Sequence, residues 1–240
     1  MPLERTANEI EHAKAVRAMF SGIARKYDLL NHLLSLNIDK RWRRLIRENL
    51  AEVLANDNAF VLDVACGTGD LSLELQKNAK AKIIGTDFCR AMLEIARDKT
   101  QTLGLRVPYI EADAMQLSFA DESFDAVSIA FGLRNLSNFQ DGLYELRRVL
   151  KKGGRLAILE FTTPSIPVFR KLFNLYFTQI LPRIGGVVSG SRETYEYLPD
   201  SVSKFPDQKL LAEMMRQTGF NGVEFKNLTG GIAAIHTGIK

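Results

Sequence analysis

The stretch FVLDVACGTGD, residues 60–70, is the part of the sequence that decides the fold. A short apolar run of strand character enters a turn with two glycines, and residues 71–75 can start a helix. Glycine in such a turn allows positive φ and close backbone approach to a ligand, and the helix N-terminus adds a favourable dipole. A strand, a glycine-rich turn and a helix together predict the first half of a parallel βαβ unit.

Further apolar runs repeat this alternation along the chain. They occupy residues 82–86, 107–111, 126–131 and 155–160, and helical patterns fall at 91–96 and 143–150. Residues 223–228 and 232–237 flank a Thr-Gly-Gly turn and predict an antiparallel hairpin. We therefore expect an α/β fold with a doubly wound, mostly parallel, seven-stranded sheet that ends in this hairpin.

The two ends of the chain and one internal segment depart from the alternation. We expect one domain over residues 1–240, with a helical cap at 1–56 and a cofactor-binding core at 57–161. A lid or substrate insert follows at 162–200, and a C-terminal helix and hairpin occupy 201–240.

Composition excludes several classes of protein. Hydrophobic residues make up 46% and charged residues 25%, which is ordinary for a globular protein. The net charge of +4 is too small for a dedicated nucleic-acid binder, so no nucleic-acid partner is expected. Two cysteines and three unclustered histidines predict neither a disulfide framework nor a metal site. No secretory signal or long apolar span stands out, and we expect a cytoplasmic protein.

The glycine turn favours one class of ligand over another. A dinucleotide fingerprint would need a third glycine where Ser72 stands, and Asp70 is electrostatically poor for a pyrophosphate. A positively charged ligand that carries an amine and a carboxylate fits better. The alternative is a tight strand–helix turn with no ligand.

Acidic residues follow the next two apolar runs. Asp87 can accept both hydroxyls of an adenosine ribose, and Phe88 beside it packs either on adenine or in the core. Asp113 and Ala114 stand where an adenine amino group needs an acceptor, although Asp113 could also be a surface aspartate. Because ligands of open α/β sheets bind at the carboxyl ends of strands, these positions predict one adenosine site.

Residues 62–69 together with Asp87 and Asp113 resemble the class I S-adenosylmethionine-dependent methyltransferases. The resemblance implies S-adenosylmethionine as cofactor and a set of cofactor-binding residues: Asp63, Gly67, Thr68, Gly69, Asp87, Phe88, Asp113 and Ala114. The sequence FGLRN at 131–135 replaces the Asn-Pro-Pro-aromatic loop of amine methylation in this class. Neither cysteine suits the nucleophile of cytosine C5 methylation.

Residues 131–135 also narrow the resemblance to the ubiquinone/menaquinone biosynthesis C-methyltransferases. Similar blocks occur in order along nearly the whole chain, at 27–31, 35–42, 148–155, 195–198 and 228–232. The chain departs from the family pattern at Asn37, Asp39, Lys40 and Lys152. The resemblance implies methyl transfer to a ring carbon of a reduced isoprenoid quinone precursor, with demethylmenaquinol the first choice. A benzoquinol of ubiquinone biosynthesis and another small molecule are the alternatives.

Ring-carbon methylation requires an electron-rich ring, so the expected substrate is the quinol. We expect Arg134 to stabilise the developing phenolate and Asn135 to orient a ring oxygen, with Tyr27 doing likewise from the cap. Arg134 could instead form a surface ion pair, and Tyr27 could be a buried aromatic residue. His32 is an alternative general base. No metal is needed, because the sulfonium is already an activated electrophile.

Two basic and apolar segments predict how a lipid substrate is reached. Residues 166–188 are apolar with a few cations, and Lys40, Arg41, Arg43, Arg44 and Arg47 surround Trp42. We expect transient contact with the inner face of a membrane, or else a lid packed on the core or a homodimer interface. Rival functions are RNA methylation, cofactor binding without catalysis and nicotinamide-dependent redox chemistry.

Overall fold

The computed structural model describes residues 6–35, 37–162, 164 and 192–240. Seven strands form one sheet in the order β3-β2-β1-β4-β5-β7-β6. They are β1 (Phe60–Val64), β2 (Lys82–Asp87), β3 (Tyr109–Glu111), β4 (Phe124–Ala130), β5 (Leu150–Phe161), β6 (Asn221–Leu228) and β7 (Ala233–Ile239). The first five are parallel, and β7 pairs antiparallel with both β5 and β6. The predicted sheet and its closing hairpin are confirmed.

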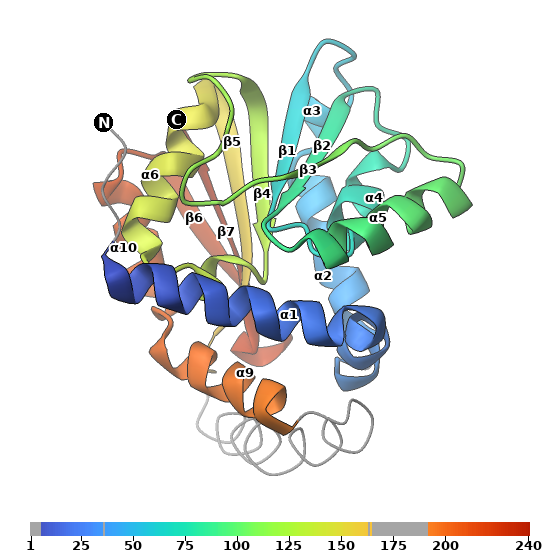
Figure 1. Cartoon of the computed structure of the whole chain (residues 1–240). Coiled ribbons are helices and arrows are strands. Elements are labelled where there is room, and N and C mark those ends of the chain that lie inside the picture. The colour runs from blue at the N-terminus through green and yellow to red at the C-terminus, as the bar shows by residue number, and fades with distance from the viewer. Residues whose placement is uncertain (1–5, 36, 163, 165–191) are drawn as a thin grey trace.

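Helices cover both faces of the sheet, as Figure 1 shows. The packed helices are α2 (Ile38–Asn49), α3 (Ala51–Leu54), α4 (Asp70–Gln76), α5 (Arg90–Thr102), α6 (Phe139–Val149) and α10 (Gln208–Gln217). Alternate residues of one strand enter different cores: Val61 packs with the helices α2 to α5, whereas Leu62 packs with α6 and α10. This two-sided burial explains why the strands read as continuous apolar runs.

The N-terminal cap consists of α1 (Ala7–Leu34) together with α2 and α3. In Figure 1, α1 crosses one end of the sheet, and α9 (Arg192–Lys204) lies beyond it. Most of the predicted insert at 162–200 lies outside the described residues. Helix α9 extends to Lys204, past the expected end of the insert at residue 200. Among the described helices, none is long and apolar enough to cross a membrane.

Candidate active site

A cavity opens at the carboxyl ends of β1, β2 and β4, with α1 on its other side, and encloses about 1010 Å³ including space open to solvent. Most of the sequence-predicted residues line it: Tyr27, Asp63, Gly67, Thr68, Asp87, Phe88, Asp113, Ala114 and Asn135. Gly69 and Arg134 are not among the lining residues. The lining also includes residues that the sequence did not single out as site residues, of which Arg43, Asp70 and Phe131 matter most below.

The glycine turn has the conformation that its sequence requires. Gly67 and Gly69 have φ of 55° and 83°, a region in which a side chain is strained. A Cβ on Gly69 would also stand 2.6 Å from the Tyr109 hydroxyl oxygen. Gly69 therefore shapes the turn, and its part in cofactor binding stays a prediction.

Asp63 is completely buried at the end of β1. The hydroxyls of Ser72 and Ser128 donate to its two carboxylate oxygens, at 2.6 and 3.0 Å. Burial nevertheless raises the pKa of Asp63 to about 7, although both hydroxyls lower it. A carboxyl poised near neutrality beside the cavity favours a cationic ligand, because a positive charge would stabilise its ionised form.

Asp87 ends β2 and fixes the adjoining turns through its carboxylate. Its oxygens accept the backbone N–H groups of Gly67 and Cys89, both at 2.8 Å. Burial raises the pKa of Asp87 to about 6. Phe88 borders the cavity, and the Arg17 guanidinium lies 5.5 Å from its ring centre. Each carboxylate oxygen keeps accepting capacity beyond one bond, so ribose hydroxyls fit this group chemically.

The third strand end supplies Asp113 and Ala114, which both border the cavity. The Asp113 carboxylate accepts the backbone N–H of Met115 at 2.9 Å, which turns the chain after β3. The structure thus brings the ends of β1, β2 and β3 to one cavity, as the sequence predicted. A base and a ribose would meet acidic groups from three successive strands there.

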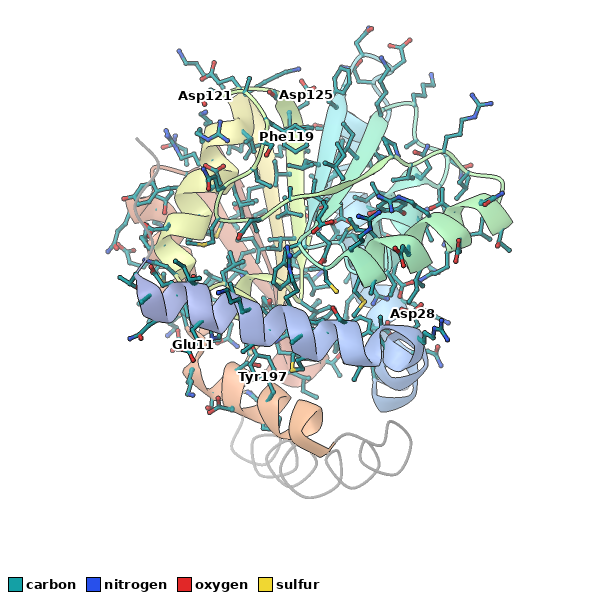
Figure 2. The ribbon with its side chains drawn as sticks, viewed as in Figure 1. Glu11, Asp28, Phe119, Asp121, Asp125 and Tyr197 are labelled. Atoms are coloured by element: carbon teal, nitrogen blue, oxygen red, sulfur yellow. The ribbon has the colours of Figure 1, made fainter. Side chains whose placement is uncertain are left out.

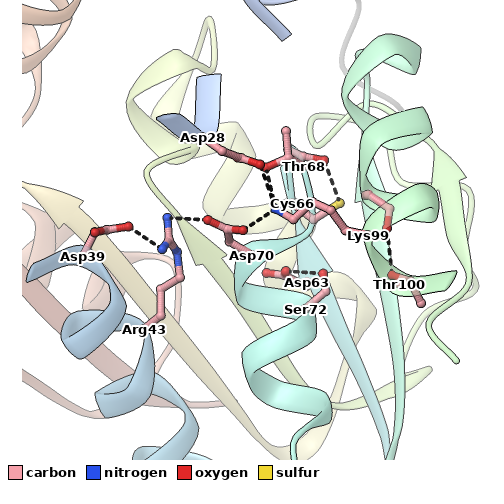
Figure 3. Close-up of polar contacts among 12 residues, drawn as sticks. Asp28, Asp39, Arg43, Asp63, Cys66, Thr68, Asp70, Ser72, Lys99 and Thr100 are labelled. Carbon is pink, nitrogen blue, oxygen red and sulfur yellow. Dashed lines mark hydrogen bonds and ion pairs between the residues drawn. The ribbon is translucent and has the colours of Figure 1, made fainter. Parts of the chain in front are cut away.

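A charged network joins the cap to the glycine turn (Figure 3). Lys99 of α5 forms ion pairs with Asp28, at 2.9 Å, and with Asp70. Arg43 of α2 contacts the same Asp70 at 3.3 Å. Thr68 donates its hydroxyl to Asp28. Two cations therefore offset the acid that made this turn unsuitable for a pyrophosphate.

Arg43 is held further by Asp39, whose carboxylate it reaches at 2.5 Å. No sequence motif places Asp28, Arg43 or Lys99 at the cofactor turn. Lys99 lies 29 residues from Asp70, and Asp28 lies 71 residues from Lys99. Side chains so far apart in sequence carry no local motif, and only the charge of Asp70 signalled that partners were needed.

The residues that follow β4 correct the expectation for Arg134. Arg134, in the short 3₁₀ helix η1 (Leu133–Asn135), does not face the cavity, and it is not on the surface either. Its side chain is only 6% exposed and pairs at 2.8 Å with Glu160, which is fully buried on β5. Direct contact with a substrate oxygen is therefore not what this geometry offers, because the guanidinium is directed at Glu160 and the Phe131 carbonyl.

Asn135 and Tyr27 do border the cavity. Asn135 accepts the Tyr197 hydroxyl of α9 at 3.2 Å, and His12 of α1 lies 3.3 Å from its backbone carbonyl oxygen. Tyr27 meets Phe20 edge to face, with ring centres 5.8 Å apart. Figure 2 labels Tyr197 on α9. The His32 side chain, the alternative base, lies outside the described residues.

Comparisons with known proteins identify the family of the chain. The model of the ubiE/COQ5 methyltransferase family matches residues 7–240. Demethylmenaquinone methyltransferases of Deinococcus radiodurans and Thermus thermophilus are 47% and 48% identical. The matches cover 96% and 92% of this chain and 94% and 99% of theirs. A Geobacter sp. (strain M21) protein named ubiquinone/menaquinone biosynthesis C-methyltransferase is 46% identical over 96% of this chain and 98% of its own.

Solved structures agree on the fold. An S-adenosylmethionine-dependent methyltransferase of Thermotoga maritima has a TM-score of 0.62 at 20% identity, over 93% of this chain and 99% of its own. Another from Aquifex aeolicus has a TM-score of 0.57 at 20% identity, over 80% and 87%. With the family match over nearly the whole length, the chain belongs to the ubiE/COQ5 methyltransferase family and is an S-adenosylmethionine-dependent enzyme, as its sequence predicted.

Proposed function

We propose that this enzyme transfers a methyl group from S-adenosylmethionine to a ring carbon of a reduced isoprenoid quinone precursor, with demethylmenaquinol as the substrate. The observation that carries the proposal is the composition of one cavity. Its lining combines the acidic strand ends with the aromatic residues Phe20, Tyr27 and Phe131. The relatives named demethylmenaquinone methyltransferases support the same substrate.

The cofactor side holds the donor. S-adenosylmethionine supplies, when bound, a methyl group activated by a positively charged sulfur. Asp87 accepts the ribose hydroxyls, Asp113 and Ala114 border the adenine, and Phe88 packs against it. Gly67 and Thr68 leave room for the backbone to approach the ligand, and buried Asp63 supplies negative charge behind it.

The acceptor side makes the ring nucleophilic and places it. A quinol carries electron-donating oxygens, and removal or sharing of a phenolic proton raises electron density on the attacking ring carbon. Asn135 and Tyr27 border the cavity with polar groups that orient the ring oxygens. Arg134 is not among the residues that line the cavity, and its guanidinium is paired with the buried Glu160 carboxylate. In-line placement of the ring carbon and the methyl group then lowers the barrier. The new carbon–carbon bond would form as the sulfur–methyl bond breaks, S-adenosylhomocysteine would leave, and the methylated ring carbon would lose its proton to water.

Single-turnover methylation under anaerobic conditions tests the proposal. The enzyme, S-adenosylmethionine and reduced demethylmenaquinone are mixed, and the methylated quinol is identified by mass spectrometry. A parallel reaction with the reduced benzoquinone precursor decides between the two quinols. Transfer to demethylmenaquinol is expected, and faster transfer to the benzoquinol would replace it as substrate. No methylation of either would overturn the proposal.

Contact with a membrane surface at the cytoplasmic face belongs to the same proposal. The basic cluster around Trp42 is divided in the structure, because Arg43 and Arg47 pair inward with Asp70 and Glu74. Lys40, Arg41 and Arg44 remain exposed on α2 and support attraction to anionic lipids. Co-sedimentation should be stronger with vesicles of phosphatidylglycerol than with phosphatidylcholine, and charge reversal at these three positions should abolish the difference. A homodimer stays a prediction that analytical ultracentrifugation tests.

A further inference from the structure

Phe131 has a backbone conformation that an aromatic residue rarely adopts. It follows β4 directly with a φ of 57°, in the left-handed region where a side chain is strained. Its backbone N–H donates to the Leu159 carbonyl at 2.8 Å, which continues the pairing of β4 with β5. Strain of this kind persists only where the surroundings enforce it, and it concentrates at functional sites. Phe131 also borders the cavity.

Side chains from two neighbouring positions hold the Phe131 carbonyl. Arg134 donates to it from a guanidinium nitrogen at 2.6 Å, and the Asn135 amide donates at 3.2 Å. The same guanidinium nitrogen reaches Glu160, and the other Glu160 oxygen accepts the Arg134 backbone N–H at 3.2 Å. Two of the residues that the sequence predicted as catalytic thus share one visible task, which is to fix the backbone of Phe131.

The Phe131 ring is supported from the protein side. Its centre lies 4.6 Å from that of Phe161, with the planes 33° apart, and 6.1 Å from that of Trp42. Trp42 is anchored in turn, since its indole N–H donates to the Thr229 hydroxyl at 3.0 Å. The Arg134 guanidinium lies 5.9 Å from the centre of the Phe131 ring. These contacts restrict rotation of the half-buried Phe131 ring, and its remaining surface faces the cavity.

We propose that Phe131 is the platform that positions the aromatic ring of the methyl acceptor, and that the Arg134–Glu160 pair is the clamp that holds this platform in its strained conformation. The inference rests on the proposed function in that the acceptor is a planar quinol. A phenyl face suits such a ring by offset or edge-to-face stacking. The core alone does not explain the strain, because a phenyl group reaches a core equally well from ordinary strand geometry.

Kinetics of Phe131→Leu and Phe131→Tyr test the platform. The leucine variant keeps apolar bulk but loses stacking, so KM for the quinol should rise roughly 3- to 10-fold. The tyrosine variant should restore KM to within about twofold of the original protein, and both variants should bind S-adenosylmethionine normally by calorimetry. Phe119→Leu is the matched control. Phe119 is also half-buried and meets another phenylalanine edge to face, but it lies outside the cavity lining, at the far end of the molecule from Tyr197 in Figure 2.

Two results would overturn the platform. One is an unchanged KM and kcat for the quinol in Phe131→Leu. The other is a loss of cofactor affinity with unchanged KM for the quinol, which would assign Phe131 to the cofactor. Should the original protein methylate no quinol, the proposed function fails by itself. Calorimetric binding of naphthohydroquinone in the presence of S-adenosylhomocysteine then still compares the original protein with Phe131→Leu.

A double-mutant cycle tests the clamp. Glu160→Gln keeps the shape of the side chain but removes the charge that holds Arg134, and it should raise KM for the quinol much as Phe131→Leu does. Glycine adopts positive φ without strain, so Phe131→Gly removes both the ring and the need for a clamp. Adding Glu160→Gln to Phe131→Gly should therefore raise KM no further. Independent, additive losses would overturn the clamp. If Glu160→Gln folds poorly, Arg134→Lys takes its place in the cycle, because lysine keeps the positive charge but lacks the planar guanidinium.

Discussion

The two sides of the cavity differ in the elements of the fold that their contacts join. On the cofactor side, Asp63 is bound by Ser72 nine residues away, and Asp87 by Gly67 twenty residues away. On the acceptor side, Asn135 meets His12 across 123 residues and Tyr197 across 62. The carboxylates of Asp63 and Asp87 are therefore held within the βαβ core, whereas Asn135 gains its contacts with α1 and α9 only once these helices and the sheet have come together.

The largest expected effect comes from removing the buried Arg134–Glu160 ion pair on the acceptor side of the cavity. Arg134→Ala leaves the Glu160 carboxylate buried without its counter-charge, and we expect a loss of about 3–5 kcal/mol in the free energy of unfolding. Urea denaturation measures it. The control is Arg155→Ala, which removes an arginine paired with the exposed Glu52 and should change stability by at most about 1 kcal/mol. Equal, small losses in both variants would mean that the Arg134 pair is no more than a surface contact.

The next effect concerns the cofactor side. Asp87→Ala should weaken S-adenosylmethionine binding by about 1–3 kcal/mol, because two ribose hydroxyls lose a charged acceptor. The backbone N–H groups of Gly67 and Cys89 lose their acceptor as well, so the free energy of unfolding should also fall. Calorimetry at a temperature where the variant is folded separates binding from stability.

Asp121→Ala is the control for this measurement. Asp121 is exposed, pairs with Arg148 and lies outside the cavity lining, so its removal should leave cofactor affinity unchanged. An Asp87→Ala variant that binds S-adenosylmethionine as tightly as the original protein would contradict the placement of the ribose.

The same contrast explains what the sequence could and could not predict. Apolar periodicity predicted the sheet because burial on both faces demands it, and the strand-end acids followed because parallel strands end at one edge. The burial of Arg134 could not be predicted locally, since it depends on Glu160 from the neighbouring strand, 26 residues on. Neither could the inward turn of Arg43 and Arg47, whose acidic partners belong to α4. The strain at Phe131 has no sequence signal at all.

A pH titration of cofactor binding should test the cofactor side, because Asp87 on that side has a raised pKa. The pKa of Asp87 is raised to about 6, so this carboxyl is protonated below that pH and accepts ribose hydroxyls poorly. S-adenosylmethionine affinity should therefore fall as the pH drops through 6, by about fivefold between pH 6 and pH 5. Fluorescence titrations between pH 5 and pH 8 measure this, and Asp87→Ala should remove the part of the fall centred near pH 6 while leaving the part that Asp63, with a pKa of about 7, contributes. A flat profile in the original protein would contradict the assignment.

The stability of the cofactor-free protein should respond in the opposite direction. A carboxyl whose pKa is raised on folding binds protons more tightly in the folded chain than in the unfolded chain. The contribution of Asp87 is fully present below its unfolded pKa of 3.8 and is lost as the pH rises through about 6. The difference in unfolding free energy between the original protein and Asp87→Ala should accordingly shrink from pH 4 to pH 7. A difference that grows over this interval would contradict the raised pKa.

The smallest expected effect lies where the two sides meet. Asp28 ties the cap helix α1 to Lys99 and Thr68, but its side chain is 28% exposed. Asp28→Asn should therefore change the free energy of unfolding by less than about 1 kcal/mol. Cofactor release should respond more clearly, because α1 borders the cavity and Thr68 lines it. Stopped-flow measurement should show S-adenosylmethionine dissociating up to about fivefold faster, the equivalent of one such ion pair. Added salt should reduce the difference, since the pair is partly exposed to solvent.

The control is Asp98→Asn. Asp98 is an exposed acid on the same helix as Lys99, and its replacement should leave the dissociation rate unchanged. If the two variants release the cofactor at the same rate, the Asp28 contact does not fasten the cap to the cofactor turn.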